Sequence, residues 1–383
     1  MVSNLAIGST VLATTIAFVV AALLVPVLQF PARRIGLIDD PCRRKRHDGS
    51  VPLTGGLAMF LAVIVAFGVN LGNLIDYTSL LLGMSLLLAV GILDDLLDLR
   101  ALVKLAAQVL VATITVAWAG LEVHQLGQLF GPLLGPVGLG PFSTVFTVIS
   151  IVFMVNVINM ADGIDGLAGG ICLLFFAVLA LIAWLAGSPP SLVGMCLVMM
   201  AATGGFLIWN MRFPFRPTAS VFMGDAGSMM LGFAAAWLAI AVATVPGSER
   251  SVYPILIVWV LLVPSMDTLA VILRRLSQGR SPMSPDRTHL HHILRRCGLS
   301  VTATVGLIHL SVIGSGLIGV AAWQAGVSEW ILFLVAALTI SLYALALINA
   351  HRFLRWGLRR RSRARYTRPT LTQVGDKPGK QQP

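Results

Sequence analysis

The feature that most constrains this chain is a series of long apolar stretches separated by short polar segments. About 17–25 consecutive apolar residues are enough for a helix to cross the hydrocarbon core of a bilayer. Only 11% of the 383 residues are charged, whereas a typical soluble domain has about 25%. The sequence therefore predicts an all-α polytopic membrane protein. Eleven transmembrane helices are expected, at about residues 5–30, 52–70, 79–93, 101–119, 142–158, 168–186, 191–208, 228–245, 254–273, 303–323 and 328–349.

The basic residues indicate how these helices are oriented. Of the 27 lysines and arginines, all except Arg250 fall in alternate connecting segments or in the C-terminal tail. Because cytoplasmic segments carry the excess of positive charge in membrane proteins, we expect a periplasmic N-terminus and a cytoplasmic C-terminus. Residues 1–350 are expected to form a single membrane domain. Residues 351–383 form a basic cytoplasmic tail, expected to be partly disordered and to contact anionic membrane lipids.

Carboxylates also gather on the predicted cytoplasmic side, which the orientation of the helices does not require. On the external side, four acidic residues fall one to a connection: Asp76, Glu122, Glu249 and Glu329. The cytoplasmic loops and helix ends hold Asp94, Asp95, Asp98, Asp162, Asp165, Asp225 and Asp286. A site that uses both signs of charge is therefore expected at that face.

The segment "GILDDLLDLR" places three carboxylates at the end of the third predicted helix. Asp94 and Asp98 would share one face if the helix continued, with Asp95 about 100° away. Three carboxylates this close repel one another, and at a helix C-terminus they oppose the helix dipole. A solvated helix end is one interpretation. The other is a functional site, in which Lys104 offsets the charge or binds an anion.

The segment "NVINMADGIDGLAGG" carries amides and carboxylates at a spacing of three: Asn156, Asn159, Asp162 and Asp165. On a helix these side chains would lie along one face, and the glycines between them would allow close backbone contact or a break. Their oxygen atoms suit Mg²⁺ or the hydroxyl groups of a sugar or ribose. Polar contacts that only hold two helices together are the alternative.

The segment "VFMGDAGSMM" places Asp225 between two glycines, just before the eighth predicted helix. Asp225 or Ser228 could simply cap this helix. A helix N-terminus also attracts phosphate, and a carboxylate beside a phosphate would need a bridging divalent cation. Phe222, three residues earlier, could stack on a base or lie in the bilayer interface.

The segment "GRSPMSPDRTHLHHILRRCG" combines His289, His291 and His292 with several arginines, among them Arg287. On a helix, His289 and His292 would share a face, and the histidines could form a metal cluster. Three imidazoles within four residues are a weak zinc pattern, however. Arginines bind phosphate in a bidentate manner and histidines donate N–H bonds, so we expect a diphosphate-binding loop.

Two further features stand apart. The basic run "PCRRKRHDGSVPLTGG" could serve only to orient the neighbouring helices, or its Arg46 and His47 could form the rim of a phosphate site. Asp267 lies two turns inside the ninth predicted helix. We expect it to face the bundle interior and to pair with a neighbouring helix, in a structural or electrostatic role rather than in direct catalysis.

Together these segments suit chemistry on a phosphorylated lipid, whose tail stays in the bilayer while a nucleotide-linked donor arrives from the cytoplasm. Phosphoryl transfer needs a metal ion and cationic side chains to neutralise phosphate charge, and a group that orients the nucleophile. A cation-coupled transporter would instead hold its carboxylates near the bilayer midplane. A non-catalytic scaffold would not need five polar segments on one face.

The same five segments, in the same order, resemble those of the polyprenyl-phosphate N-acetylhexosamine-1-phosphate transferases. The likeness extends to about residue 350 and is carried by "RKRHDGSVPLTGG", "LDDLLD", "NVINMADGIDGLAGG", "VFMGDAGS" and "SPMSPDRTHLHHI". The form "HLHH" is similar to the branch of the family that uses UDP-N-acetylglucosamine. It differs from the run of three histidines in the phospho-N-acetylmuramoyl-pentapeptide transferases.

The resemblance implies a multi-pass enzyme of the bacterial inner membrane with Mg²⁺, or Mn²⁺, as its metal. It implies transfer of N-acetylglucosamine-1-phosphate from UDP-N-acetylglucosamine to undecaprenyl phosphate, with release of UMP, as the first step of lipid-linked cell-surface polysaccharide synthesis. Another UDP-N-acetylhexosamine donor and the pentapeptide transferase reaction are alternatives. No nucleic-acid partner is expected, and the chain could act as a homodimer. Direct attack by the lipid phosphate is favoured over a covalent aspartyl intermediate, because the phosphate is already an anion near neutral pH.

The resemblance also implies roles for individual residues. Asp225 resembles the main metal ligand and Asn159 a second one. Asp94, supported by Asp95 and Asp98, is similar to the carboxylate that activates the lipid phosphate, which Lys104 would contact. Asp162 is expected to be catalytic and to line the nucleotide pocket with Asp165. The other residues expected to contact the nucleotide, diphosphate or sugar are Arg46, His47, Asn156, Phe222, Arg287, His289, His291 and His292.

Overall fold

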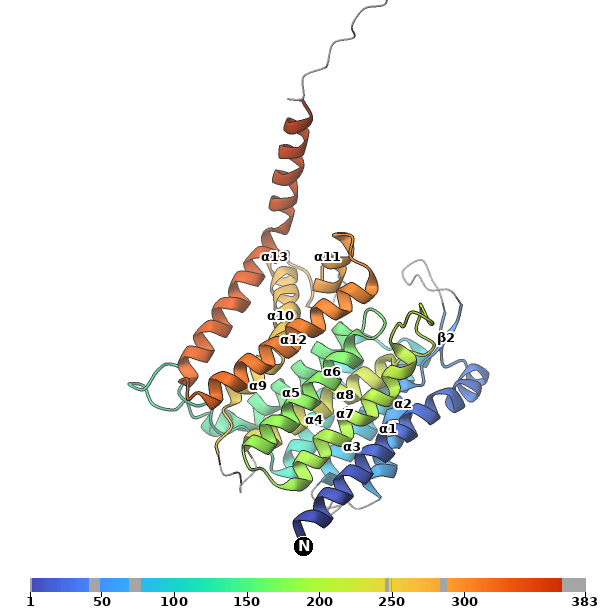
Figure 1. The fold of residues 1–383 in the computed structure, drawn as a ribbon. Coiled ribbons are helices and arrows are strands. Elements are labelled where there is room, and N and C mark those ends of the chain that lie inside the picture. Colours follow the sequence, from blue (N-terminus) through green and yellow to red (C-terminus); the bar gives the residue numbers. More distant parts are fainter. Residues whose placement is uncertain are drawn as a thin grey trace, which may run out of the picture.

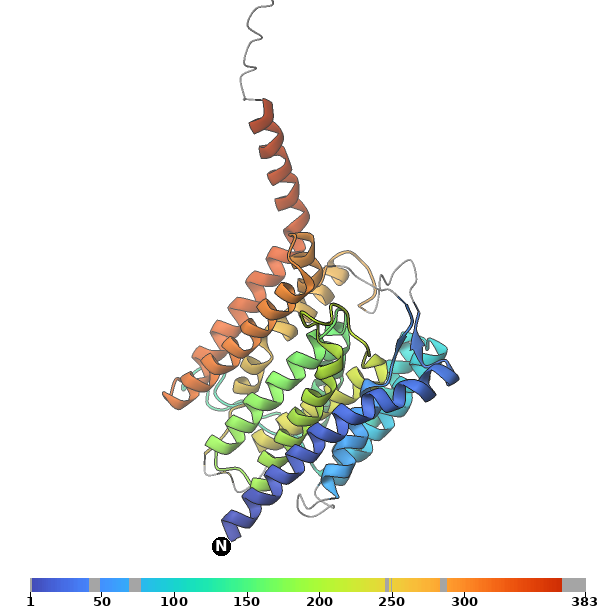
Figure 2. The same ribbon diagram turned by 45° about the vertical axis from the view of Figure 1, so that its right-hand side comes forward.

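The structure is a computed structural model that describes residues 2–40, 49–68, 77–244, 248, 250–282 and 288–366, with only the backbone at 2–7 and 350–366. In this part of the chain it is a bundle of helices with one small sheet (Figures 1 and 2). The antiparallel strands are β1 (Ile38–Asp39) and β2 (Val51–Pro52). The helices are α1 (Val2–Ile35), α2 (Gly55–Phe67), α3 (Thr78–Leu97), α4 (Ala101–Ala119), a 3-10 turn (Gly140–Phe142), α5 (Ser143–Ala161), α6 (Leu167–Leu185), α7 (Pro190–Asn210), α8 (Gly224–Thr244), α9 (Pro254–Val260), α10 (Leu262–Ser277), α11 (Leu290–Arg296), α12 (Val301–Gln324) and α13 (Glu329–Tyr366).

The prediction of a polytopic all-α membrane protein is confirmed. Within the described residues, nine helices are long and apolar enough to cross a membrane, or ten if α9 and α10 count as one broken span. The nine are α1, α3, α4, α5, α6, α7, α8, α12 and α13. The expected count of eleven therefore does not emerge from the described part of the chain.

Two of the expected spans differ from the structure. The segment 254–273 is broken at Leu261 into α9 and α10, which are bent by 85°. Pro264 has no backbone N–H to donate to the turn before it, so a continuous helix is disfavoured there. The segment 52–70 contains the helix α2, which has only 13 residues. Helix α2 begins at Gly55 rather than at residue 52, because the backbone here pairs with the loop that precedes α8. Pro52 accepts a hydrogen bond from the N–H of Phe222, and the N–H of Gly55 donates to the carbonyl of Phe222.

Helix α8 lies in the middle of the bundle (Figure 1). It packs against α2, α3, α5 and α6. Of its most apolar stretch of 18 residues, 94% is buried inside the protein. Small residues allow this close packing: a Cβ on Gly56 of α2 would lie 2.5 Å from the backbone nitrogen of Gly227. The N-terminus of α8, which carries Asp225, is therefore held by several surrounding helices.

The two termini of the described chain lie at opposite ends of the bundle (Figure 1). Helix α11, strand β2 and the far end of α13 share one end, and the N-terminus lies at the other (Figures 1 and 2). Arg250, the single basic residue predicted for the external side, donates to the carbonyl of Trp323 at 2.8 Å and lies over its indole ring. The guanidinium group of Arg250 thus binds the end of α12.

Candidate active site

Lys104, near the start of α4, lies between two carboxylates from different helices. Its Nζ donates to Oδ2 of Asp94 in α3 at 2.7 Å and to Oδ2 of Asp225 in α8 at 2.8 Å. The Asp94 side chain is only 5% exposed, whereas that of Asp225 is 31% exposed. The other oxygen of Asp94 accepts a hydrogen bond from the backbone of Leu99 at 2.9 Å. Lys104 thus pairs with two of the carboxylates, which is one of the two possibilities that the sequence left open for it.

Asp95 caps the start of α8 from the neighbouring helix. Its Oδ1 accepts the backbone N–H of Asp225 at 2.9 Å, and its Oδ2 accepts that of Ala226 at 3.3 Å. Gly224 makes this approach possible, because its φ is +69° and a Cβ there would collide with the Asp95 carboxylate. The interpretation that Asp225 or Ser228 caps α8 is therefore wrong: the free N–H groups are bound by a residue of α3.

Asn159 of α5 joins this cluster. Its Nδ2 donates to Oδ1 of Asp225 at 2.7 Å and to the hydroxyl of Ser228 at 2.9 Å. Asn156 lies one turn earlier, and its amide donates to Oε1 of Gln108 in α4 at 2.7 Å. Our sequence analysis did not single out Gln108, although a glutamine in the apolar stretch of α4 is a signal that could have found it.

Asp98 does not belong to the cluster. Helix α3 ends at Leu97, and Asp98 follows it in the left-handed conformation with φ +50°. Its side chain is exposed. The shared face expected for Asp94 and Asp98 would have required the helix to continue, so this prediction is wrong.

The stripe of polar residues from Asn156 to Asp165 is not one helical face either. Helix α5 ends at Ala161, and α6 starts after Gly166, whose φ is +79°. Asp165 lies in the turn between them and its Oδ2 accepts from Arg212 at 2.7 Å and from the backbone of Ala219 at 3.2 Å. Asp165 thus holds the loop between α7 and α8, and Arg212 is a partner that our sequence analysis did not identify. Asp162 is exposed in the same turn.

The histidines lie at the start of α11. His289 precedes the helix in an extended conformation, with ψ 151°, so the expected common face of His289 and His292 is not formed. The ring of His289 instead stacks on that of His291, with centroids 5.9 Å apart. The ring of His292 is tilted by 47° to that of His291, and the two centroids are 4.2 Å apart.

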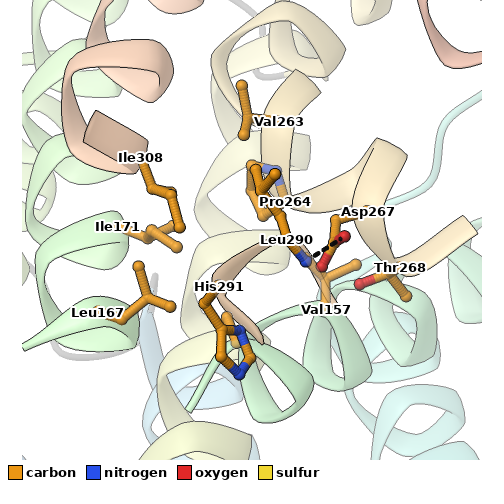
Figure 3. Close-up of a pocket in the computed structure, with 11 residues that line it drawn as sticks. Val157, Leu167, Ile171, Val263, Pro264, Asp267, Thr268, Leu290, His291 and Ile308 are labelled. Carbon is orange, nitrogen blue, oxygen red and sulfur yellow. Dashed lines mark hydrogen bonds between the residues drawn. The ribbon is translucent and has the colours of Figure 1, made fainter. Parts of the chain in front are cut away.

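His291 docks this segment on the turn between α5 and α6. It is buried, and a Cβ on Gly163 would lie 2.6 Å from its Nε2. Figure 3 shows the imidazole directed away from Asp267. Burial, together with the neighbouring His292 and His289, lowers the pKa of His291 to about 3, so its ring is neutral near neutral pH. The histidine segment and the "DGIDG" turn therefore meet in space.

The remaining predicted contacts divide into two groups. Phe222 is half-buried and packs on an apolar cluster formed by Ala32, Leu37 and Leu53. Its backbone N–H donates to Pro52 at 3.0 Å, which ties the β2 segment to the start of α8. Arg46, His47 and Arg287, and the tail beyond residue 366, lie outside the described residues.

The donor set at Asp225 fits a magnesium ion only in part. Among the described residues, no group of three or more His, Cys, Asp or Glu side chains could hold a metal. Mg²⁺ in proteins that bind phosphates commonly takes one or two protein oxygens and completes its shell with water and phosphate. Asp225 and Asn159 can supply those oxygens. The cluster also contains three carboxylates and one ammonium group, so a divalent cation would balance its excess negative charge.

These features define an integral membrane enzyme with a charged site at one end of its helices. The sequence model of glycosyl transferase family 4 matches residues 77–243. The chain is 34% identical to the undecaprenyl-phosphate alpha-N-acetylglucosaminyl 1-phosphate transferase of Salmonella typhi, over 89% of this chain and 93% of the relative. The protein of that name in Escherichia coli strain K12 is also 34% identical, over 89% and 93%. That of Haemophilus influenzae is 33% identical, over 91% and 97%.

The chain therefore belongs to glycosyl transferase family 4, and the resemblance to the polyprenyl-phosphate N-acetylhexosamine-1-phosphate transferases is confirmed. It is a phosphoglycosyltransferase and a multi-pass membrane protein. The matched region begins with α3 and ends with α8. It thus includes Asp94, Asp95, Lys104, Asn159 and Asp225.

Proposed function

We propose that this protein transfers N-acetylglucosamine-1-phosphate from UDP-N-acetylglucosamine to undecaprenyl phosphate. The names of its relatives support both the acceptor and the sugar. The observation that carries the proposal within the structure is the position of Lys104 between Asp94 and Asp225. A cation held beside carboxylates at the end of membrane helices suits a lipid phosphate whose tail remains in the bilayer.

In this reaction a phosphate oxygen of undecaprenyl phosphate attacks the β-phosphorus of the donor. A new bond forms between that oxygen and the β-phosphorus. The bond from the β-phosphorus to the oxygen that bridges to the α-phosphorus breaks, and its electrons leave with UMP. The product is undecaprenyl-diphospho-N-acetylglucosamine. Because the attacking oxygen is already anionic, direct attack needs no covalent intermediate, and the product would serve as the first intermediate of a lipid-linked polysaccharide.

We propose Asp225 and Asn159 as the ligands of a Mg²⁺ ion, with Mn²⁺ as a substitute. When bound, the ion would neutralise charge on the donor diphosphate. Asp225 suits this role because its carboxylate is the more exposed one of the pair that binds Lys104. Asn159 is already within 2.7 Å of it. Asp95 positions Asp225 through the backbone N–H of that residue.

Lys104 is the proposed contact to the lipid phosphate, and Asp94 orients it. Both oxygens of Asp94 are engaged, one by Lys104 and one by the backbone of Leu99. This arrangement favours a positioning role for Asp94 over that of a base. Lys104 keeps a second hydrogen bond to Asp225, so the acceptor phosphate and the metal site would be neighbours.

The turn between α5 and α6 and the histidine segment are proposed to bind the donor. The Asp162 side chain is exposed, whereas that of Asp165 is only 12% exposed and binds Arg212. This difference favours Asp162 for contact with the nucleotide and Asp165 for holding the loop that leads to α8. His289, His291, His292 and Arg287 would surround the diphosphate and sugar. The site would face the cytoplasm, where UDP-sugars are made, with the N-terminus in the periplasm.

The test uses the purified full-length protein in detergent with undecaprenyl phosphate, Mg²⁺ and a panel of UDP-sugars. We expect UMP release with UDP-N-acetylglucosamine and a lipid product that carries the sugar. Release of UMP only with a different UDP-N-acetylhexosamine would overturn the proposed donor. No release with any donor, from a protein shown to be folded by its thermal unfolding, would overturn the proposed reaction.

A further inference from the structure

We infer that Asp267 is a positioning residue that fixes the orientation and the tautomer of His289. The inference rests on the proposed function, in which His289 contacts the donor. Asp267 lies in α10, the second half of the broken span, and is separated from His289 by 22 residues of the chain. None of the roles proposed above uses it, although it is an acidic residue in a largely apolar helix bundle.

The carboxylate of Asp267 binds two consecutive residues at the start of α11. Its Oδ2 accepts a hydrogen bond from Nδ1 of His289 at 2.9 Å, and its Oδ1 accepts the backbone N–H of Leu290 at 2.8 Å. The bond to Leu290 is drawn in Figure 3. Leu290 is the first residue of α11, so Asp267 also satisfies one of the free N–H groups of that helix. The side chain and the backbone of the histidine segment are thus held by one carboxylate.

A third hydrogen bond holds the carboxylate of Asp267 itself in place. The hydroxyl of Tyr343 in α13 donates to Oδ1 of Asp267 at 2.7 Å. Asp267 is therefore held between α11 and α13, and it has little freedom to rotate. A side chain whose own position is set by several bonds can set the position of the next side chain.

Burial makes these contacts necessary. The Asp267 side chain is 13% exposed and that of His289 is 7% exposed. Asp267 lines a cavity of about 20 Å³ whose other lining side chains are mostly apolar, including Leu167, Ile171 and Ile308 (Figure 3). A buried carboxylate is costly unless it is hydrogen-bonded. An apolar residue would fill this place without that cost, so the carboxylate is best explained by what it holds.

The contact to Asp267 also selects the tautomer of His289. An ionised carboxylate can only accept hydrogen bonds, so Nδ1 of His289 carries the hydrogen. Nε2 is then the acceptor of the neutral ring, or a second donor of the protonated ring. No described residue makes a hydrogen bond to Nε2 of His289. That nitrogen remains for the donor substrate, on a ring held parallel to His291.

The variant Asp267→Asn tests this inference. The backbone N–H of Leu290 and the hydroxyl of Tyr343 both need an acceptor at the Oδ1 position, so the amide nitrogen must take the Oδ2 position. It then donates to Nδ1 of His289 and moves the ring hydrogen to Nε2. We expect kcat/KM for UMP release to fall about 10- to 100-fold, by analogy with the loss of the carboxylate that orients a metal-bound histidine. Thermal unfolding should change little, because the shape and two of the hydrogen bonds are kept.

Two variants serve as controls. Tyr343→Phe removes one hydrogen bond to Asp267 but leaves the tautomer of His289 unchanged, and it should retain most of the activity. Asp267→Glu keeps an acceptor-only carboxylate and should retain more activity than Asp267→Asn. In an Asp267→Asn, His289→Ala double variant, the loss should not exceed that of His289→Ala alone, since both changes act through one ring.

A direct measurement of the tautomer distinguishes this inference from the proposed function. In protein with ¹⁵N-labelled histidine, the His289 signals, assigned by their absence in His289→Ala, should report hydrogen on Nδ1 in the wild type and on Nε2 in Asp267→Asn. The same tautomer in both proteins, or full activity of Asp267→Asn, would overturn the inference while leaving the reaction intact. Absence of UMP release from the wild type would overturn the reaction, and the tautomer result would still stand.

Discussion

Asp95 and Asp225, 130 residues apart in the chain, are joined by a hydrogen bond of 2.9 Å from the backbone N–H of Asp225 to the carboxylate of Asp95. The bond explains how α3 determines where the start of α8 lies. Because Lys104 and Asn159 also bind Asp225, the position of one carboxylate depends on three other helices. This dependence leads to the first two predictions.

Removal of the Asp95 carboxylate should weaken both the fold and the activity. Asp95→Ala leaves the first N–H groups of α8 without their acceptor, and the loss of such a cap costs about 0.5–2 kcal/mol of unfolding free energy. Thermal unfolding in detergent, measured together with UMP release, checks both effects. Asp95→Asn keeps one acceptor oxygen and should be less affected. An Asp95→Ala protein as stable as the wild type would show that the cap contributes nothing.

Asp225→Asn should abolish most of the activity and weaken its dependence on Mg²⁺. The substitution removes the charge that attracts a divalent cation but keeps the size of the side chain and one oxygen ligand. UMP release measured over a range of Mg²⁺ concentrations checks this prediction. Glu122→Gln is a matched control at the other end of the bundle, where Glu122 accepts a hydrogen bond from Thr144, and it should be fully active. Equal damage from the two substitutions would contradict the location of the site.

Lys104→Met should raise the KM for undecaprenyl phosphate and leave the KM for the UDP-sugar nearly unchanged. We expect a rise of about 10- to 100-fold, since a hydrogen bond to a charged group is worth about 1.5–3 kcal/mol. Lys104→Arg, which keeps the charge, should show a smaller rise. A rise in the KM of the UDP-sugar alone would instead place Lys104 on the donor.

The buried His291 should make stability depend on pH in the acidic range. Burial lowers its pKa from 6.5 to about 3 in the folded protein, so the unfolded chain binds a proton between these values and the folded protein does not. Its contribution to stability is complete above about pH 6.5 and is lost as the pH falls towards 3. Between about pH 7.5 and 5 the wild type should lose about 2 kcal/mol more than His291→Gln. Unfolding of both proteins at the two pH values checks the difference, and parallel losses would contradict it.

The contact between α2 and α8 should not tolerate a methyl group. A Cβ on Gly56 would lie 2.5 Å from the backbone of Gly227, and backbone cannot move aside as a side chain can. We expect Gly56→Ala to cost about 1–3 kcal/mol, as overpacking commonly does. Gly306→Ala in α12 is the matched control, since nothing lies within 4 Å of its Cβ position. It should leave the melting temperature unchanged or raise it slightly.

Much of the fold could be predicted from the sequence because hydropathy is a local property. Most apolar stretches became helices near their expected positions, for example 101–119 as α4 and 168–186 as α6. The prediction failed where apolar sequence does not imply a straight helix. The break at Leu261 comes just before Pro264, which has no backbone N–H to donate. The start of α2 at Gly55 depends on pairing of this segment with the loop before α8.

The candidate site was predicted in its residue types but not in its contacts. Asp94, Lys104, Asn159 and Asp225 do meet in the structure. Asp98 is absent from this group because α3 ends one residue before it. The expected helical stripe through Asp165 is interrupted by the turn after Ala161. Spacing rules assume that a helix continues, and the ends of these helices are determined by what packs against them.

The sequence by itself determined that this is a multi-pass membrane protein, and that its polar segments resemble those of one enzyme family. Length, apolar composition and the order of motifs can all be read along the chain. Only the tertiary structure decided which partner each charged group has: Asp95 binds the backbone of α8, Asp165 binds Arg212, and Asp267 binds His289 and Tyr343. The reason is physical, because a buried carboxylate needs donors, and in a helix bundle those donors come from segments far apart in the sequence.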